Sequence, residues 1–166
     1  MLSVSDLMIR ALEEDDVEHV RWALFQAVSW NPERKLPPYE SLIEHPELAR
    51  YHRAWGRTGD LGVLAEIDGA VAGAAFCRLF TDDDHGHGYV DDRTPELAVA
   101  VVDAQRGRGI GRRLMVDLAD AACAAGFAQL SLSVDTDNPA LRLYERLGYR
   151  ELTRDDGGVR MLLELR

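Results

Sequence analysis

The segment Gln105-Arg106-Gly107-Arg108-Gly109-Ile110-Gly111-Arg112-Arg113 has the composition of a phosphate-binding turn. It lies between an apolar run typical of a strand and an amphipathic run typical of a helix. Backbone amides and the dipole at a helix N-terminus favour a pyrophosphate, and glycines let the backbone approach its oxygens closely. A dinucleotide-binding fingerprint would need glycine at position 112, and a Walker loop would need a lysine that the segment lacks. The alternative is a tight turn whose arginines are simply solvated.

The elements that must position this turn follow from hydrophobic periodicity and turn signals. We expect strands over 8–12, 63–67, 70–80, 95–102, 127–135, 149–154 and 159–165. We expect helices from Asp15 or Asp16 to about Trp30, over 39–56 with an interruption at Pro46, over 109–125, and from Asn138 to Gly148. Asp68-Gly69 and Asp155-Asp156-Gly157-Gly158 are hairpin signals. This order predicts an α/β fold, a mixed sheet covered by helices, in one domain over residues 1–166.

The chain as a whole is acidic although this turn is basic. It has 29 Asp and Glu against 19 Lys and Arg, a net charge of −10, which argues against nonspecific binding to nucleic acid or to an anionic membrane. No 18-residue apolar run is present, and residues 1–6 lack the pattern of a secretion signal. With only Cys77 and Cys123, we expect a cytoplasmic protein without a disulfide framework. The acidic loop Asp82–His87 is interpreted as solvated, and no metal is expected.

Three segments together resemble one family. Arg106-x-x-Gly109-x-Gly111 resembles the acyl-CoA signature of the GCN5-related N-acetyltransferase (GNAT) family. Glu96-Leu97-Ala98-Val99-Ala100-Val101 resembles the family's fourth strand, and Asn138 to Tyr149 resembles its Asn…Leu-Tyr-x-x-x-Gly-Phe/Tyr segment. The specific similarity covers residues 95–149, and the remainder agrees in element order. The resemblance implies a mostly antiparallel central sheet, flanked by helices and splayed between its fourth and fifth strands.

The resemblance also implies acetyl-CoA as the acyl donor and gives the matched residues their roles. The turn would hold the pyrophosphate, and the backbone of strand 95–102 would contact the pantetheine arm. The implied cofactor-binding residues are Val99, Val101, Arg106, Gly107, Arg108, Gly109, Ile110, Gly111, Arg112 and Asn138. Asn138 would equally serve as a helix N-cap.

Two residues are the implied catalytic pair. Glu96 would be the base, because strand alternation places it on one face with the small Ala98 and Ala100, which leave room for a substrate. Tyr144 would be the acid that protonates the thiolate of CoA. The alternatives are a charged residue at a strand entrance for Glu96 and a core aromatic for Tyr144.

The implied reaction is transfer of an acyl group from acetyl-CoA to a primary amine by direct attack. Candidate acceptor contacts are Trp30, Tyr39, His87 and Tyr89. The acidic chain favours a cationic acceptor, either a small amine or a peptide amine. A protein-lysine or N-terminal acetyltransferase and a non-catalytic acyl-CoA-binding regulatory module are the alternatives. Monomer and homodimer both remain open.

Overall fold

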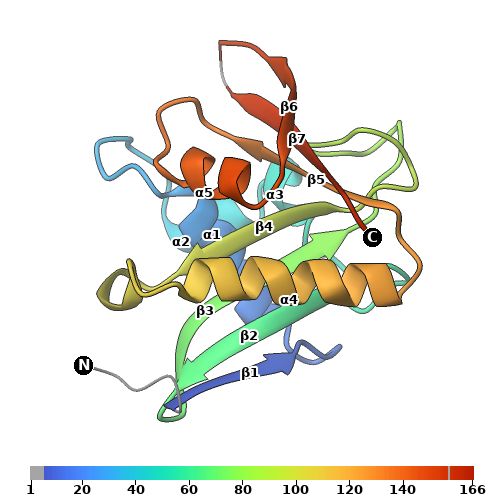
Figure 1. Cartoon of the computed structure of the whole chain (residues 1–166). Helices are drawn as coiled ribbons and strands as arrows, with labels where there is room; N and C mark the ends of the chain where they lie inside the picture. Colours follow the sequence, from blue (N-terminus) through green and yellow to red (C-terminus); the bar gives the residue numbers. More distant parts are fainter. Residues whose placement is uncertain (1–5, 157) are drawn as a thin grey trace.

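The computed structural model describes residues 6–156 and 158–166, in which a seven-stranded sheet separates two layers of helices (Figure 1). The strands are β1 (Leu7–Ala11), β2 (Leu61–Ile67), β3 (Ala70–Arg78), β4 (Glu96–Val101), β5 (Gln129–Val134), β6 (Arg150–Arg154) and β7 (Val159–Glu164). Their order across the sheet is β1-β2-β3-β4-β5-β7-β6. Strands β4 and β5 run parallel, and the other neighbouring pairs of this sheet are antiparallel. The expected mixed, mostly antiparallel sheet is therefore confirmed.

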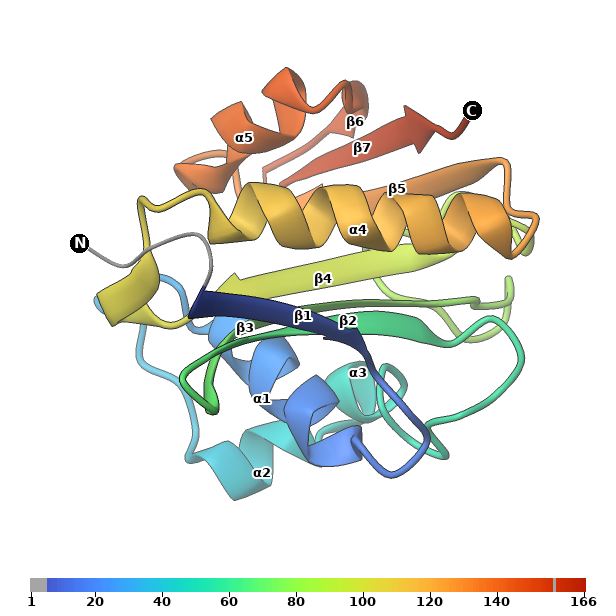
Figure 2. The same ribbon diagram turned by 60° about the horizontal axis from the view of Figure 1, so that its bottom comes forward.

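Helices cover both faces of the sheet. They are α1 (Val17–Val28), α2 (Tyr39–Ile43), α3 (Pro46–Ala49), α4 (Ile110–Ala124) and α5 (Ala140–Arg146), with a 3₁₀ turn, η2, over Asp103–Gln105. Figure 2 shows α4 and α5 on one side of the sheet and α1, α2 and α3 on the other. Side chains of β3 alternate between the two layers, since Ala75 packs in the cluster with Leu114 of α4 and Ala74 in the cluster with Leu24 of α1. The protein therefore has one hydrophobic core on each face of the sheet.

The sheet opens between β4 and β5. Their ladder consists of a single register pair, Glu96 with Ser131, whereas β4 pairs with β3 from Glu96 to Val101 and β5 pairs with β7 from Gln129 to Val134. Beyond Glu96, the edge of β4 that faces β5 therefore has no strand partner among the described residues. The expected splay is confirmed, and it leaves backbone hydrogen-bonding groups available inside the fold.

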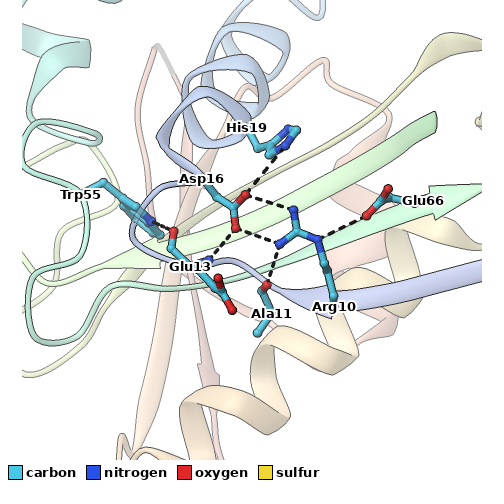
Figure 3. Close-up of polar contacts among 7 residues, drawn as sticks. All are labelled: Arg10, Ala11, Glu13, Asp16, His19, Trp55 and Glu66. Carbon is cyan, nitrogen blue, oxygen red and sulfur yellow. Dashed lines mark hydrogen bonds and ion pairs between the residues drawn. The ribbon is translucent and has the colours of Figure 1, made fainter. Parts of the chain in front are cut away.

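The connection from β1 to α1 is fixed by a carboxylate rather than by a helix cap (Figure 3). Asp16 occupies the N-cap position of α1, but its side chain makes no cap hydrogen bond. It accepts two hydrogen bonds from Arg10, at 2.8 and 3.0 Å, and one from the backbone N–H of Glu13 at 2.7 Å. The bonds from Arg10 are the main reason that the pKa of Asp16 falls to about 2. The expected α1 is two residues too long, because the helix ends at Val28 and not at Trp30.

Turn residues account for most of the other boundaries. Asp68 and Gly69 have φ angles of 51° and 81°, as the predicted β2–β3 hairpin requires. Pro46 divides the expected helix 39–56 into α2 and α3, but the expected end is wrong, because α3 ends at Ala49 and residues 50–54 form turns. The second hairpin is also present, although Gly157 of its turn lies outside the described residues. Within residues 6–156 and 158–166, no helix is long and apolar enough to span a bilayer, and no cluster of three metal-ligating side chains occurs.

Candidate active site

A continuous cavity of about 1840 Å³ lies at the splay. Its lining includes Glu96 to Val101 of β4, Leu132 to Val134 of β5, and residues of α5. The lining also reaches the segment after α1 and the far strand β7. The cavity therefore touches both faces of the sheet and connects elements that are distant in the sequence.

The glycine-rich turn opens into this cavity at the start of α4. Gly109 is the N-cap in a left-handed conformation with φ 84°, and Gly107 has φ 78°. Among the described residues no side chain caps the helix, so the first backbone N–H groups of α4 have no partner there. In the described part of the chain, no heavy atom lies within 4 Å of the Cβ that a substitution at Gly107 or Gly109 would add. The space next to these two glycines is therefore open to a ligand. These features fit a bound pyrophosphate group.

The arginines of the turn are less free than their sequence indicates. Arg106 pairs with Asp103 at 3.1 Å, and Arg113 pairs with Asp117 at 3.3 Å. Arg112 lines the cavity and Arg108 does not, and neither has an ion pair among the described residues. Residues 104–116 contain no acidic residue, but the aspartates on either side of this range pair with two of the four arginines of the turn.

Glu96 is a buried carboxylic acid at the narrow end of the splay. The residue is 3% exposed, and it faces the layer of α1, α2 and α3, as do Ala98 and Ala100. Burial raises the pKa of Glu96 to about 7, and a hydrogen bond from the Tyr51 hydroxyl limits the rise. Its other carboxyl oxygen, Oε1, has no hydrogen-bond partner among the described residues. A buried acid that titrates near neutrality and lines a cavity is suited to exchange protons with a ligand.

Tyr51 is the partner of Glu96 that sequence reasoning missed. It follows α3, is 8% exposed, lines the cavity and donates its hydroxyl proton to Glu96 Oε2. Arg78 holds this segment in place, because its Nη1 donates to the backbone carbonyls of Arg50 and Arg53 at 2.9 and 2.7 Å. No local motif announces the contact, since Tyr51 and Glu96 are 45 residues apart in the chain.

The loop before β4 closes over the same carboxylate. A Cβ on Gly86 would overlap the Tyr51 hydroxyl, and a Cβ on Gly88 would lie 2.8 Å from Glu96 Cγ. The His-Gly-His-Gly segment therefore carries its glycines because the backbone passes directly against Glu96 and Tyr51. In that loop the glycines, rather than the histidines, indicate the close approach of the backbone to another part of the chain.

Tyr144 of α5 lies on the opposite face, in the core cluster with α4. It lines the cavity, and its hydroxyl makes no hydrogen bond with the described residues. Burial raises the pKa of Tyr144 to about 12, so the phenol stays protonated. Tyr149 packs against it edge-on, with ring centroids 6.1 Å apart. Tyr144 is thus both a core aromatic and a free proton donor at the cavity.

The remaining sequence candidates divide into those at the cavity and those away from it. Val99, Val101, Gly111, Asn138, Trp30 and His87 line it, whereas Tyr39 and Tyr89 do not. Tyr39 instead packs edge-on against Phe25, at 5.1 Å between ring centroids, and Tyr89 stacks on His85 at 4.3 Å. Asn138 lies one residue before the N-cap of α5, which is Pro139, so the expected N-cap role is wrong by one position; its side chain still accepts a hydrogen bond from the Ala140 amide at 2.9 Å.

Trp30 closes one side of the cavity mouth. Its Nε1 donates to Asp135 at the end of β5, at 2.7 Å, and Arg34 adds an ion pair with the same carboxylate at 3.4 Å. The segment after α1 is thereby tied across the opening between β4 and β5.

Comparison with models of protein families shows to which family the chain belongs. The model of the acetyltransferase (GNAT) family matches residues 19–149. The chain belongs to the GNAT family. A search of curated protein sequences finds no significant relative.

Solved structures share the GNAT fold over nearly the whole chain. YncA from Salmonella typhimurium, solved with its cofactor acetyl-CoA, is 24% identical, with a TM-score of 0.66 and coverage of 97% of this chain and 95% of that chain. PaiA N-acetyltransferase from Thermoplasma acidophilum, in complex with coenzyme A, is 17% identical, with a TM-score of 0.69 and coverage of 95% and 98%. The ribosomal-protein-S18-alanine N-acetyltransferase from Escherichia coli is 22% identical, with a TM-score of 0.64 and coverage of 96% and 94%. At these identities the structural likeness establishes the fold.

Proposed function

We propose that this GNAT protein transfers the acetyl group of acetyl-CoA to a primary amine by direct attack. The observation that carries the proposal is the cavity at the splay, which joins the uncapped N-terminus of α4 to the buried carboxyl group of Glu96. Two structural neighbours with the same fold were solved with acetyl-CoA and with coenzyme A, which supports the choice of donor.

The donor would be held by backbone groups more than by side chains. Acetyl-CoA supplies an acetyl group already activated as a thioester. The free amides of Ile110, Gly111 and Arg112 suit its pyrophosphate, with Arg106 and Arg108 nearby. The open edge of β4 offers the peptide groups of Val99 and the N–H of Val101, with which a pantetheine arm can pair as an added strand would, while the Val101 carbonyl already accepts a hydrogen bond from Arg106 Nε at 3.3 Å. Asn138 lines the route between these two sites.

Proton transfer would be divided between the two faces of the sheet. Glu96, with a pKa near 7, takes the proton that the acceptor nitrogen must lose. The new N–C bond forms as the C–S bond breaks, and Tyr144 donates its proton to the departing sulfur. Solvent then returns the proton to Tyr144 and removes the one on Glu96. Holding both reactants at the splay can supply about 7–11 kcal/mol of the barrier, so the acid and base add to an effect of positioning.

Calorimetric titration with acetyl-CoA, followed by an assay of thiol release with a panel of amines, tests the proposal. We expect saturable binding and release of CoA that depends on an amine. The variants Glu96→Gln and Tyr144→Phe should each lower turnover by about 10²- to 10⁴-fold while donor binding is retained. Binding without turnover of any amine would favour the regulatory module, and absence of binding would refute the proposal. Peptides with free N-termini or lysines belong in the panel, because protein acetylation is the nearest alternative.

A further inference from the structure

The guanidinium group of Arg160, at the cavity, has no carboxylate partner among the described residues. Arg160 of β7 lines the cavity, and its Nε is buried without a hydrogen-bond partner among the described residues. Its Nη1 donates to the backbone carbonyl of Tyr89 at 2.6 Å, which fixes the direction of the side chain. A buried donor left unpaired is costly, so this group is a candidate for binding a ligand.

The edge of Arg160 formed by Nε and Nη2 is the edge through which other arginines of this protein bind carboxylates. Arg78 donates through Nε and Nη2 to the two oxygens of Asp60, at 2.8 and 2.7 Å, while its Nη1 binds backbone carbonyls. Arg154 donates through the same edge to Glu151, with both distances 2.9 Å. Like Arg78, Arg160 donates through Nη1 to a backbone carbonyl. Unlike Arg78, it has no carboxylate of a described residue bound to the fork of its Nε and Nη2. The fork has the shape for two parallel bonds to a carboxylate.

Arg160 lies on the same face of the sheet as Glu96. Its strand neighbours Val159 and Met161 pack in the core with α4, so alternation directs Arg160 to the opposite face. Its register partners, Ser133 of β5 and Thr153 of β6, also line the cavity. Two hydroxyl side chains therefore lie beside the guanidinium.

The separation from Glu96 is short. Glu96 pairs with Ser131, and Arg160 pairs with Ser133, so a single strand lies between them. Two strand spacings are about 10 Å, and the two-residue offset from Ser131 to Ser133 adds about 7 Å along the strand, so the backbones are about 12 Å apart and both side chains extend over the same face. The loop before β4 links the two, because Gly88 lies against Glu96 and the next carbonyl, that of Tyr89, holds Arg160. Such a span suits a compact molecule with an amine at one end and an anion at the other.

Nearby acids do not neutralise this fork. Asp135 also lines the cavity, but it is bound by Trp30 and Arg34. Asp155 lines the cavity as well and accepts the amide proton of Gly158 at 3.1 Å through Oδ1. The positive charge of Arg160 is thus available inside an otherwise acidic protein.

We propose that Arg160 binds the carboxylate of an amino-acid acceptor whose amine is directed toward Glu96. The inference rests on the proposed acetyl transfer and narrows the acceptor from any primary amine to a zwitterionic one. It disfavours polyamines, which have no carboxylate, and peptide N-termini, whose α-carboxyl group is consumed in the peptide bond.

Acetylation of the twenty L-amino acids, each compared with its methyl ester, tests the anchor. The ester keeps the side chain and loses the negative charge of the α-carboxylate, and because this loss also lowers the pKa of the amine, kcat/KM is compared per unprotonated amine. We expect at least one free amino acid to be acetylated with a kcat/KM about 10- to 100-fold above that of its ester, the range given by hydrogen bonds between charged groups. If no free amino acid exceeds its ester, or none is acetylated at all, the anchor is refuted. Turnover of esters or polyamines would at the same time leave the proposed acetyl transfer standing.

Variants of Arg160 separate anchoring from folding. In Arg160→Gln, kcat/KM for the preferred amino acid should fall to the level of its ester, mainly through KM, while the ester and acetyl-CoA binding are unaffected. Arg160→Lys keeps the charge without the fork and should recover only part of the loss. Arg154→Gln, on the neighbouring strand and away from the cavity lining, is the matched control. An equal loss of kcat/KM for the amino acid and its ester in Arg160→Gln would show a structural role and overturn the inference. If that variant does not fold, the comparison of amino acids with their esters in the wild-type protein decides the question.

Discussion

Replacing Glu96 with glutamine should stabilise the protein while it removes the proposed base. The folded protein raises the pKa of this carboxyl group from an ordinary 4.5 to about 7. The folded state therefore binds the proton more tightly than the unfolded chain does, and stability falls as the pH rises from about 4.5 through 7. The loss is complete above pH 7 and amounts to about 3 kcal/mol. Glutamine keeps the hydrogen bond from Tyr51 and carries no charge, so it avoids this cost.

Urea unfolding followed by tryptophan fluorescence, at pH values from 4.5 to 8.5, measures the effect. We expect Glu96→Gln and the wild type to have similar free energies of unfolding at pH 4.5. At pH 8.5 the variant should be more stable by about 3 kcal/mol. Glu40→Gln, which changes an exposed glutamate of α2, is the matched control and should leave the pH dependence of stability unchanged.

The reasoning fails if Glu96→Gln and the wild type lose stability in parallel between pH 4.5 and 8.5. That result would mean that the carboxylate is already ionised in the folded protein at low pH. Glu96 would then be a weak general base near neutral pH, even though it lines the cavity.

Three further predictions address the rest of the site. Tyr51→Phe removes the hydrogen bond that favours the ionised form of Glu96, so the acidic limb of the plot of turnover against pH should move up by about one to two pH units. Tyr149→Phe removes a buried hydroxyl that makes no hydrogen bond with the described residues, and as the control it should leave this limb in place. Gly111→Leu projects from the first turn of α4, where a Cβ already lies 3.6 Å from Val101 Cγ2, so titration with CoA should show at least tenfold weaker binding while the thermal midpoint changes little. Asp60→Asn leaves Arg78, which is 1% exposed, without its carboxylate, and urea unfolding should show a loss of about 3–5 kcal/mol.

The part of the site that could be predicted is the part built from local sequence. The glycine-rich turn, the strand before it and the helix after it are consecutive in the chain, so strand periodicity and glycine positions were enough to locate them. The same holds for Glu96, whose strand alternation correctly grouped it with Ala98 and Ala100. Asp68 and Gly69 were equally readable, because a two-residue hairpin is specified by its own residues.

What could not be predicted depends on contacts between distant segments. Tyr51 meets Glu96 across 45 residues, and Trp30 meets Asp135 across 105, with no spacing rule to connect them. Asp16 stands at the N-cap position, where the sequence predicts the start of α1, yet Arg10 and the Glu13 amide bind its carboxylate. The turn is also less basic than its own residues indicate, since Asp103 and Asp117 lie just outside residues 104–116 and pair with two of its arginines.

The single register pair between β4 and β5 has a consequence for the integrity of the fold. Strands β5, β6 and β7 join the rest of the sheet through one rung, so most of the hydrogen bonds that would bind the two halves are missing in the protein alone. A donor bound in the splay as proposed would supply bonds that a neighbouring strand normally gives. It would then be part of the sheet's hydrogen-bond network, and at a concentration 100 times its dissociation constant it would add about 2.7 kcal/mol to the free energy of unfolding. Amide hydrogen exchange in β5 should then slow as acetyl-CoA is added. The exchange rate of the C-terminal strands would therefore report the concentration of acetyl-CoA around the protein.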